Sequence, residues 1–163
     1  MSRPRPTTGG APRPGNTAVL LREAFLALND LVIVRLAERG HAAVRPAHAA
    51  VFQYLDDTGT TVSTLAARAQ MTKQAMAELV AHLERHGYVV RVPDPADRRA
   101  KLVQPTATGR DVVAIAQELV PEIEEQIDAT LGADRARELR RDLEVLQRAA
   151  LGRFSASGGP GAG

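Results

Sequence analysis

The chain has 163 residues, of which 44% are hydrophobic and 25% charged, so it is long enough for one globular domain and too short for two independent ones. It contains no cysteine, which excludes disulfides, thiolate metal sites, thiol nucleophiles and a thiol-oxidation switch. Apolar runs fall short of the ~20 residues that cross a bilayer, and no signal-peptide core is present, so we expect a cytoplasmic protein without membrane contact.

The net charge is only +2, but the charges are unevenly distributed along the chain. Residues 61–110 carry eight basic and four acidic side chains, whereas residues 111–163 carry six basic and ten acidic ones. A basic middle segment beside an acidic one is the pattern expected of a local contact with a polyanion, although solvated faces also cluster like charges.

The two ends of the chain differ in composition from the rest. Residues 1–16 and 153–163 are rich in Pro, Gly and Ser and offer little to bury, so we predict that both are disordered tails. The part between them, residues 17–152, is predicted to form the folded domain.

Helical periodicity begins directly after the first tail. Apolar residues recur every three or four positions from Thr17 until Gly40 stops the pattern, which predicts a first helix. A second helix is expected to open at Pro46, a favoured first-turn residue, and to run to about Leu55.

Two shorter helices should follow, separated by a tight turn. The segment TVSTLAARAQ places a hydroxyl residue before Leu65 and Ala66, and after a break at Gln70 the hydroxyl of Thr72 can cap the next helix, which ends before Gly87. Two helices at this separation are typical of a helix-turn-helix.

The next segment predicts a β-hairpin and then two long helices. YVVRV and AKLVQ are extended, and PDPADRR between them is turn-like and charged, which is the pattern of a wing. Thr106 should cap a helix that runs to about Leu131, and a last helix is expected from Ala133 to Leu151. The predicted fold class is therefore mainly α with a small β-wing.

The middle of the chain resembles the MarR family of bacterial regulators at the level of motifs. The matching features are the Leu-Ala helix, the Thr-capped helix ending Leu-Glu-x-x-Gly, the wing tip Asp-Pro-x-Asp-x-Arg and the Thr-x-x-Gly start of the next helix. Pro105 is a departure, since the family usually has leucine there. The resemblance implies a winged helix-turn-helix lobe at 46–105, dimerisation helices at 17–45 and 106–152, and a dimeric DNA-binding regulator that is not an enzyme.

The resemblance, together with the apolar stripe of the recognition helix, defines candidate DNA contacts. Lys73 and Gln74 lie in the first turn, where Gln can bridge adenine and Lys can reach guanine. Arg99 is the implied wing contact in the minor groove, with Asp97 organising the tip. The full candidate set is Ser63, Thr64, Thr72, Lys73, Gln74, Ala77, Glu78, His82, Arg85, Arg91, Asp97, Arg98, Arg99 and Lys101, and Arg68 is a further candidate for phosphate contact.

Simpler explanations stand beside several of these assignments. First-turn polar residues also solvate helix ends, and charged turns are common at hairpin tips. Glu78 either accepts a hydrogen bond from a cytosine amino group or, as we expect, pairs with His82 one turn further along the helix. The spacing of His82 and His86 suits zinc, but no third ligand is evident, so we predict neither a metal nor another cofactor.

A small-molecule effector is a further implication of the resemblance. Its candidate contacts are Phe25, Arg45, His48 and Phe52, each of which packing or solvation explains at least as well. We expect a repressor that binds a palindromic operator in double-stranded DNA as a homodimer. The alternative is a winged-helix module that contacts proteins and has lost DNA binding, against which the basic middle segment and the wing arginines argue.

Overall fold

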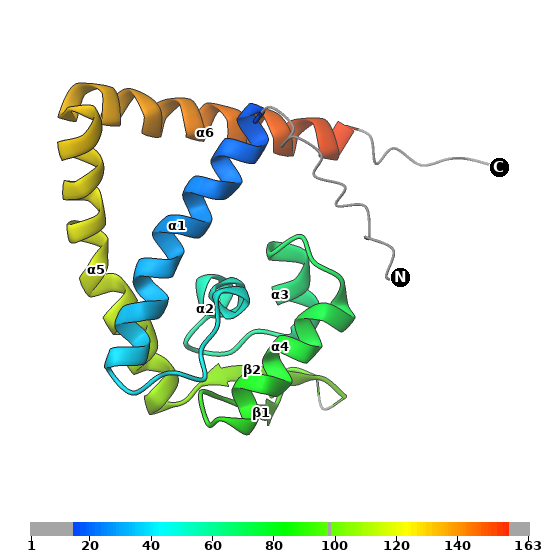
Figure 1. Cartoon of the computed structure of the whole chain (residues 1–163). Coiled ribbons are helices and arrows are strands. Elements are labelled where there is room, and N and C mark those ends of the chain that lie inside the picture. Colours follow the sequence, from blue (N-terminus) through cyan, green and yellow to red (C-terminus); the bar gives the residue numbers. More distant parts are fainter. Residues whose placement is uncertain (1–14, 98, 157–163) are drawn as a thin grey trace, which may run out of the picture. The chain divides into compact units, whose positions relative to one another are not determined.

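The computed structural model describes residues 15–97 and 99–156, so most of the two predicted tails, 1–16 and 153–163, lies outside the described residues. The elements in chain order (Figure 1) are α1 (Thr17–Glu38), η1 (Pro46–His48), α2 (Ala49–Tyr54), α3 (Val62–Arg68), α4 (Lys73–Arg85), β1 (Val89–Pro93), β2 (Lys101–Pro105), α5 (Ala107–Leu131) and α6 (Ala133–Ala156). The predicted fold class, mainly helical with a small β-wing, is confirmed.

The first helix begins at Thr17 as predicted, because Asn16 caps it: the Asn16 side chain accepts a hydrogen bond from the Val19 N–H. The last helix differs from the prediction, since α6 continues to Ala156 instead of ending near Leu151. Asn16 is therefore the cap of α1 and residues 153–156 belong to α6, although their composition placed them in the predicted tails.

Chain contacts divide the molecule into two compact units, Met1–Val112 and Val113–Gly163. In the first unit α3 packs on α4, and α4 also contacts β1 and η1. The largest fully buried side chains of this unit are Leu65, Met76, Leu83, Val51, Val80, Val89, Val103 and Val112. These residues come from the apolar faces of α2, α3 and α4, the inner positions of the hairpin and the start of α5, so the buried faces of helices and strands form one core.

The wing is an antiparallel pair in which Val89 lies opposite Pro105 and Pro93 opposite Lys101. A third short segment joins it, because the backbone of Thr60 exchanges two hydrogen bonds of 2.9 Å with Val103. Pro105, the departure from the family pattern, is buried at the end of β2.

The junction between β2 and α5 is held by Thr106. Its hydroxyl donates to the Gly87 carbonyl at 2.6 Å, and its oxygen accepts from the Gly109 N–H at 3.1 Å, which caps α5 as predicted. One turn later His41 Nε2 lies 2.8 Å from Asp111 Oδ2, so the loop after α1 is tied to the first turns of α5.

The second unit contains most of α5 and all of α6, which meet at Gly132 in a left-handed conformation with φ of 85°. Arg140 of α6 forms ion pairs with Glu124 and Asp128 of α5. Ala136 is fully buried, and these contacts together fasten the two helices across their connection.

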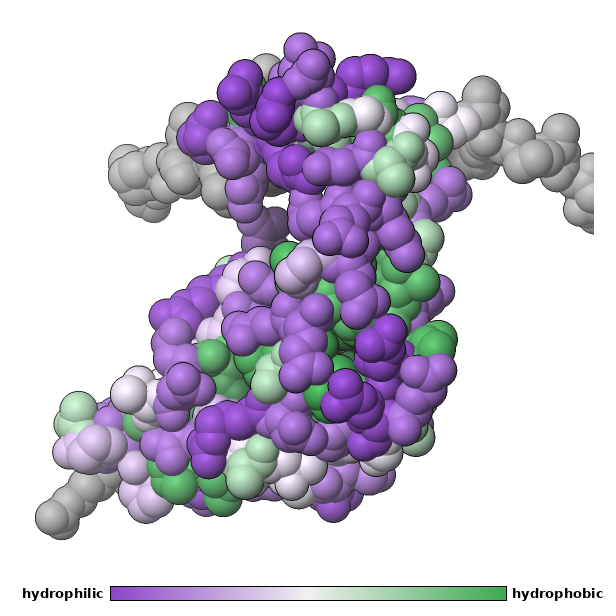
Figure 2. Space-filling model, turned by 90° about the vertical axis from the view of Figure 1, so that its left-hand side faces the viewer, coloured by the Kyte–Doolittle hydropathy of each residue, from purple (hydrophilic) through white to green (hydrophobic). Residues whose placement is uncertain are grey.

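Apolar side chains remain exposed outside the core. Figure 2 shows one face of the molecule on which hydrophobic side chains (green) lie at the surface among hydrophilic ones (purple). In α1, a helix of 22 residues, Leu36 is the one buried position, and Leu20, Phe25 and Val34 are each more than half exposed. Within the described ranges, no helix is long and apolar enough to span a membrane.

Candidate nucleic-acid interface

The recognition helix α4 presents its first turn to solvent. Thr72 caps the helix by accepting a hydrogen bond from the Ala75 N–H at 3.1 Å, as predicted. Lys73 and Gln74 are exposed, whereas Met76 on the opposite side is fully buried. The helix therefore projects a basic and an amide side chain from its N-terminal end, where a helix-turn-helix approaches base edges.

The middle of the same exposed face carries Ala77, which is half-buried, and Glu78, which is exposed. Glu78 accepts a long hydrogen bond of 3.5 Å from Gln74 Nε2. Our expectation that Glu78 pairs with His82 is wrong, because the His82 ring turns away and donates from Nε2 to the Ala43 carbonyl at 3.0 Å.

Three imidazole rings are stacked where α4 meets η1. The ring centroid of His82 lies 4.6 Å from that of His48 and 4.3 Å from that of His86. Burial, followed by the charges of His82, Arg45 and His86, lowers the pKa of His48 to about 4, so its ring is neutral at neutral pH. The His82–His86 spacing is visible in the sequence, but the stacking of His48 on His82 is not, because contacts between distant segments leave no local pattern.

No group of three or more His, Asp or Glu side chains in the described part of the chain is arranged to hold a metal ion. The three histidine rings instead face one another, and one nitrogen of each ring is hydrogen-bonded to backbone: His86 Nδ1 donates to the His82 carbonyl at 2.8 Å. His48 Nδ1 accepts from the Arg45 N–H at 2.9 Å.

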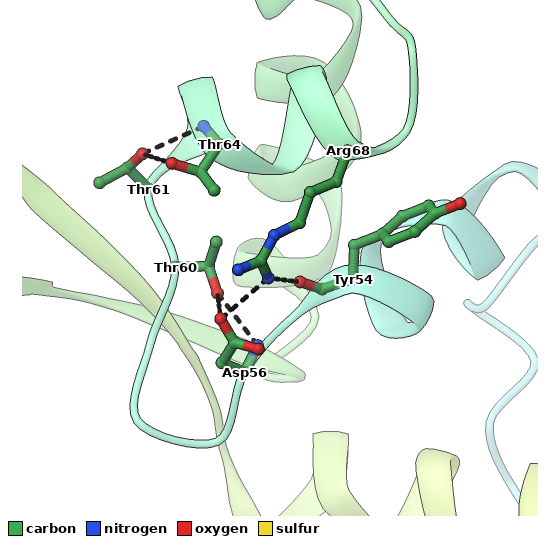
Figure 3. A network of polar contacts seen from close by, with 6 residues as sticks. All are labelled: Tyr54, Asp56, Thr60, Thr61, Thr64 and Arg68. Atoms are coloured by element: carbon green, nitrogen blue, oxygen red, sulfur yellow. Dashed lines mark hydrogen bonds and ion pairs between the residues drawn. The ribbon is translucent and has the colours of Figure 1, made fainter. Parts of the chain in front are cut away.

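The start of α3 lies in the same unit and carries two further candidates. Thr61 caps this helix, since its hydroxyl oxygen accepts from the Thr64 N–H at 3.1 Å, and the two hydroxyls are 2.9 Å apart (Figure 3). Ser63 and Thr64 are both exposed. Hydroxyls in such a position can donate to phosphate oxygens without reading sequence.

The wing tip contains two short turns, in each of which an aspartate side chain accepts a hydrogen bond from the backbone N–H two residues later. Asp94 Oδ1 accepts from the Ala96 N–H at 2.8 Å, and Asp97 Oδ1 accepts from the Arg99 N–H at 2.9 Å. Arg99 is exposed, and Arg98 lies outside the described residues. The carboxylate of Asp97 thus bends the tip so that Arg99 projects from it.

The other basic candidates differ in their freedom to contact DNA. Arg85 at the end of α4 and Lys101 at the start of β2 are exposed. Arg91 is half-buried, with its Nε 3.6 Å from Glu84 Oε2, and that Nε has no hydrogen-bond partner among the described residues. Arg68, the further candidate for phosphate contact, is bonded through its guanidinium to Asp56 and to the Tyr54 carbonyl.

The four candidates for effector contact lie in different environments. Phe25 on α1 is 60% exposed, and Arg45 is an exposed residue at the start of η1. His48 is buried in the histidine stack, and Phe52 is half-buried with its ring edge-on to Tyr88. Packing accounts for the positions of His48 and Phe52.

Comparison with known proteins agrees with this geometry. The model of the MarR family matches residues 44–100, which span η1, α2, α3, α4 and β1 and end just before β2. Transcriptional regulator HosA of Escherichia coli O111:H- is 30% identical over 118 residues, which cover 71% of this chain and 87% of HosA. The chain belongs to the MarR family of transcriptional regulators.

Solved structures of MarR-type regulators share the fold. Transcriptional regulator Tm0710 from Thermotoga maritima is 27% identical with a TM-score of 0.54, covering 83% of this chain and 94% of its own. The repressor CouR, solved with a 23-mer DNA duplex, is 24% identical with a TM-score of 0.65, covering 81% and 92%. At that identity the likeness to CouR shows the fold alone.

Proposed function

We propose that this MarR-family protein binds double-stranded DNA sequence-specifically as a homodimer and represses transcription. The observation that carries the proposal is the exposed first turn of α4, with Lys73 and Gln74, in the same compact unit as the exposed Arg99 at the wing tip. In the major groove Gln reads adenine and Lys reaches guanine, and a guanidinium suits the narrow minor groove.

Phosphate contacts would set the position of the protein on the duplex. Ser63, Thr64, Arg85 and Lys101 are exposed in this unit and fit that role. Arg91 would first have to leave Glu84, so we assign it a smaller contribution. The DNA-binding lobe in this proposal comprises residues 46–105.

The exposed apolar side chains of α1 support pairing of two copies through residues 17–45 and 106–152. Twofold pairing implies a palindromic operator with half-sites about 34–36 Å apart. We further propose that the protein acts in the cytoplasm by binding and not by catalysis, and that a small-molecule effector relieves repression, as the family resemblance implies.

The test is fluorescence anisotropy of the purified protein with duplex DNA from the intergenic region upstream of its own gene, beside a scrambled duplex of equal composition. Measurements at about 50 and about 200 mM salt separate phosphate contacts from base contacts, since each phosphate neutralised contributes roughly −0.9 to the log–log slope. Arg99→Ala tests the wing, and Arg153→Gln, near the end of α6 and outside the residues assigned to pairing, is the control for the loss of one positive charge.

Tight, salt-sensitive binding to the upstream duplex that weakens in Arg99→Ala alone is the expected result. Equal affinity for both duplexes would place the operator elsewhere, and selection from a randomised duplex pool would then identify it. Failure to bind any duplex at low salt would contradict the proposal and favour a role in protein contacts.

A further inference from the structure

Arg68, the last residue of α3, is held within the winged unit instead of extending towards a ligand. Its Nη1 donates to Asp56 Oδ2 and to the Tyr54 carbonyl, each at 2.9 Å (Figure 3). One guanidinium nitrogen therefore joins the end of α3 both to the end of α2 and to the loop that follows it.

The loop itself is closed by Asp56 and Thr60. The Thr60 hydroxyl donates to Asp56 Oδ2 at 3.1 Å and accepts from the Asp56 N–H at 3.0 Å. The hydrogen bonds from Arg68 and then Thr60 hold the pKa of the Asp56 carboxyl below its usual value, so this carboxylate is ionised at neutral pH. We call Asp56, Thr60 and Arg68 the loop clamp.

The loop clamp continues directly into the wing. Thr60 is 4% exposed, and its backbone exchanges two hydrogen bonds of 2.9 Å with Val103 in the middle of β2. Gln104 Nε2 adds a bond of 2.9 Å to the Thr58 carbonyl. A path of polar contacts thus runs from the end of α3 through the loop to β2, the strand that leads back from the wing tip.

We propose that Arg68 is a positioning residue for DNA binding: through Asp56 and Thr60 it fixes the wing relative to the helix-turn-helix, so that Arg99 and α4 contact DNA together. This inference rests on the proposed function. The side chains of Arg68 and Asp56 are 42% and 52% exposed, so their ion pair contributes little to the free energy of unfolding. Variants of the pair should fold and differ from the wild type in DNA affinity.

The direction in which Asp56→Asn changes DNA affinity distinguishes this role from direct phosphate contact. Asp56→Asn removes a negative charge, which by electrostatics alone would leave DNA affinity unchanged or raise it. If the loop clamp positions the wing, Asp56→Asn and Arg68→Gln both weaken binding, by roughly threefold to fivefold, which is the most that an exposed pair of this kind can supply. Arg153→Gln, with the same charge loss near the end of α6 and outside the residues assigned to pairing, should bind as the wild type does.

The experiment measures anisotropy with the operator duplex, or with the pool-selected duplex, for the wild type, Arg68→Gln, Asp56→Asn, Arg99→Ala and the Arg68→Gln/Arg99→Ala double variant. Circular dichroism melting of each variant confirms folding. We expect the double variant to bind about as weakly as Arg99→Ala. Arg68→Gln weakens binding by displacing Arg99 from the DNA, and that contact is already absent in Arg99→Ala.

Three other results would each contradict one step of the proposal. If Asp56→Asn binds as tightly as the wild type while Arg68→Gln binds weakly, Arg68 contacts phosphate itself. If the fold-changes of Arg68→Gln and Arg99→Ala multiply, the loop clamp does not act through the wing. If Arg99→Ala binds as the wild type does, the wing contact of the proposed function is refuted, and the inference with it.

Discussion

At the scale of single residues, the lack of a Cβ at Gly109 allows the close backbone contact at the junction between the wing and α5. A Cβ at this position would lie 2.1 Å from the Tyr88 carbonyl oxygen. That oxygen also accepts the Thr106 N–H at 3.0 Å, so it has little room to move. The Thr-x-x-Gly motif therefore combines a cap and a close backbone contact within four residues.

We predict that Gly109→Ala lowers the free energy of unfolding by about 2 kcal/mol. Alanine gains about 1 kcal/mol of helix propensity, but overpacking costs roughly 1–3 kcal/mol, and the upper end of that range applies because the overlap is with a backbone oxygen. Urea denaturation measures the difference, with the exposed neighbour Thr108→Ala as control. A stability gain in Gly109→Ala would mean that the junction relaxes freely.

His48 predicts a loss of stability in acid. Its pKa falls from 6.5 to about 4 on folding, so between these values the unfolded chain binds a proton that the folded chain does not. The free energy of unfolding should therefore decrease as pH falls from 6.5 towards 4, by up to about 3 kcal/mol.

Urea denaturation across this pH range measures the effect of His48. His48→Asn keeps an acceptor for the Arg45 N–H and does not titrate, so its stability should change less with pH than that of the wild type. Identical pH dependence in the two proteins would show that other groups cause the acid sensitivity.

At the scale of elements, the turn of the helix-turn-helix contains Gln70 with φ of 53°, the one positive φ among the described non-glycine residues. A left-handed conformation costs a side-chain-bearing residue roughly 1–2 kcal/mol. Glycine removes that cost but adds about 0.5–1 kcal/mol of unfolded-chain entropy. The turn between α3 and α4 thus retains some backbone strain.

We predict that Gln70→Gly raises the free energy of unfolding by about 0.5 kcal/mol. The converse substitution is Gly87→Ala, at a φ of 76° and with nothing within 4 Å of the new Cβ. It should lower the free energy of unfolding by about 1 kcal/mol through backbone strain alone. Thermal melting of both variants checks the pair. Destabilisation by Gln70→Gly would show that the Gln70 side chain makes a stabilising contact.

At the scale of the whole molecule, α1 offers more apolar surface than its own chain covers. Leu20, Phe25 and Val34 are 58%, 60% and 57% exposed, and apolar surface of this kind is usually covered by a partner. Pairing of two copies would also place two recognition helices on one duplex.

We predict that Leu20→Lys shifts the protein towards monomer by at least about tenfold in the dissociation constant, since a buried leucine is worth about 2 kcal/mol and a buried lysine costs more. Sedimentation equilibrium measures the constant, and Asp30→Lys at an exposed position of the same helix is the control. An unchanged dissociation constant in Leu20→Lys would show that the N-terminal turns of α1 are not part of the dimer contact.

The sequence by itself determined the order of elements, the caps at Thr72 and Thr106, the hairpin and the family, because these depend on patterns that repeat or close within a few residues. Only the tertiary structure decided the partners of Arg68 and His82 and the neutral state of His48. Those contacts join residues 12 to 39 positions apart, so they exist only once the helices have packed. The same packing joins Arg68, a phosphate candidate by sequence, to Asp56 and to the Tyr54 carbonyl.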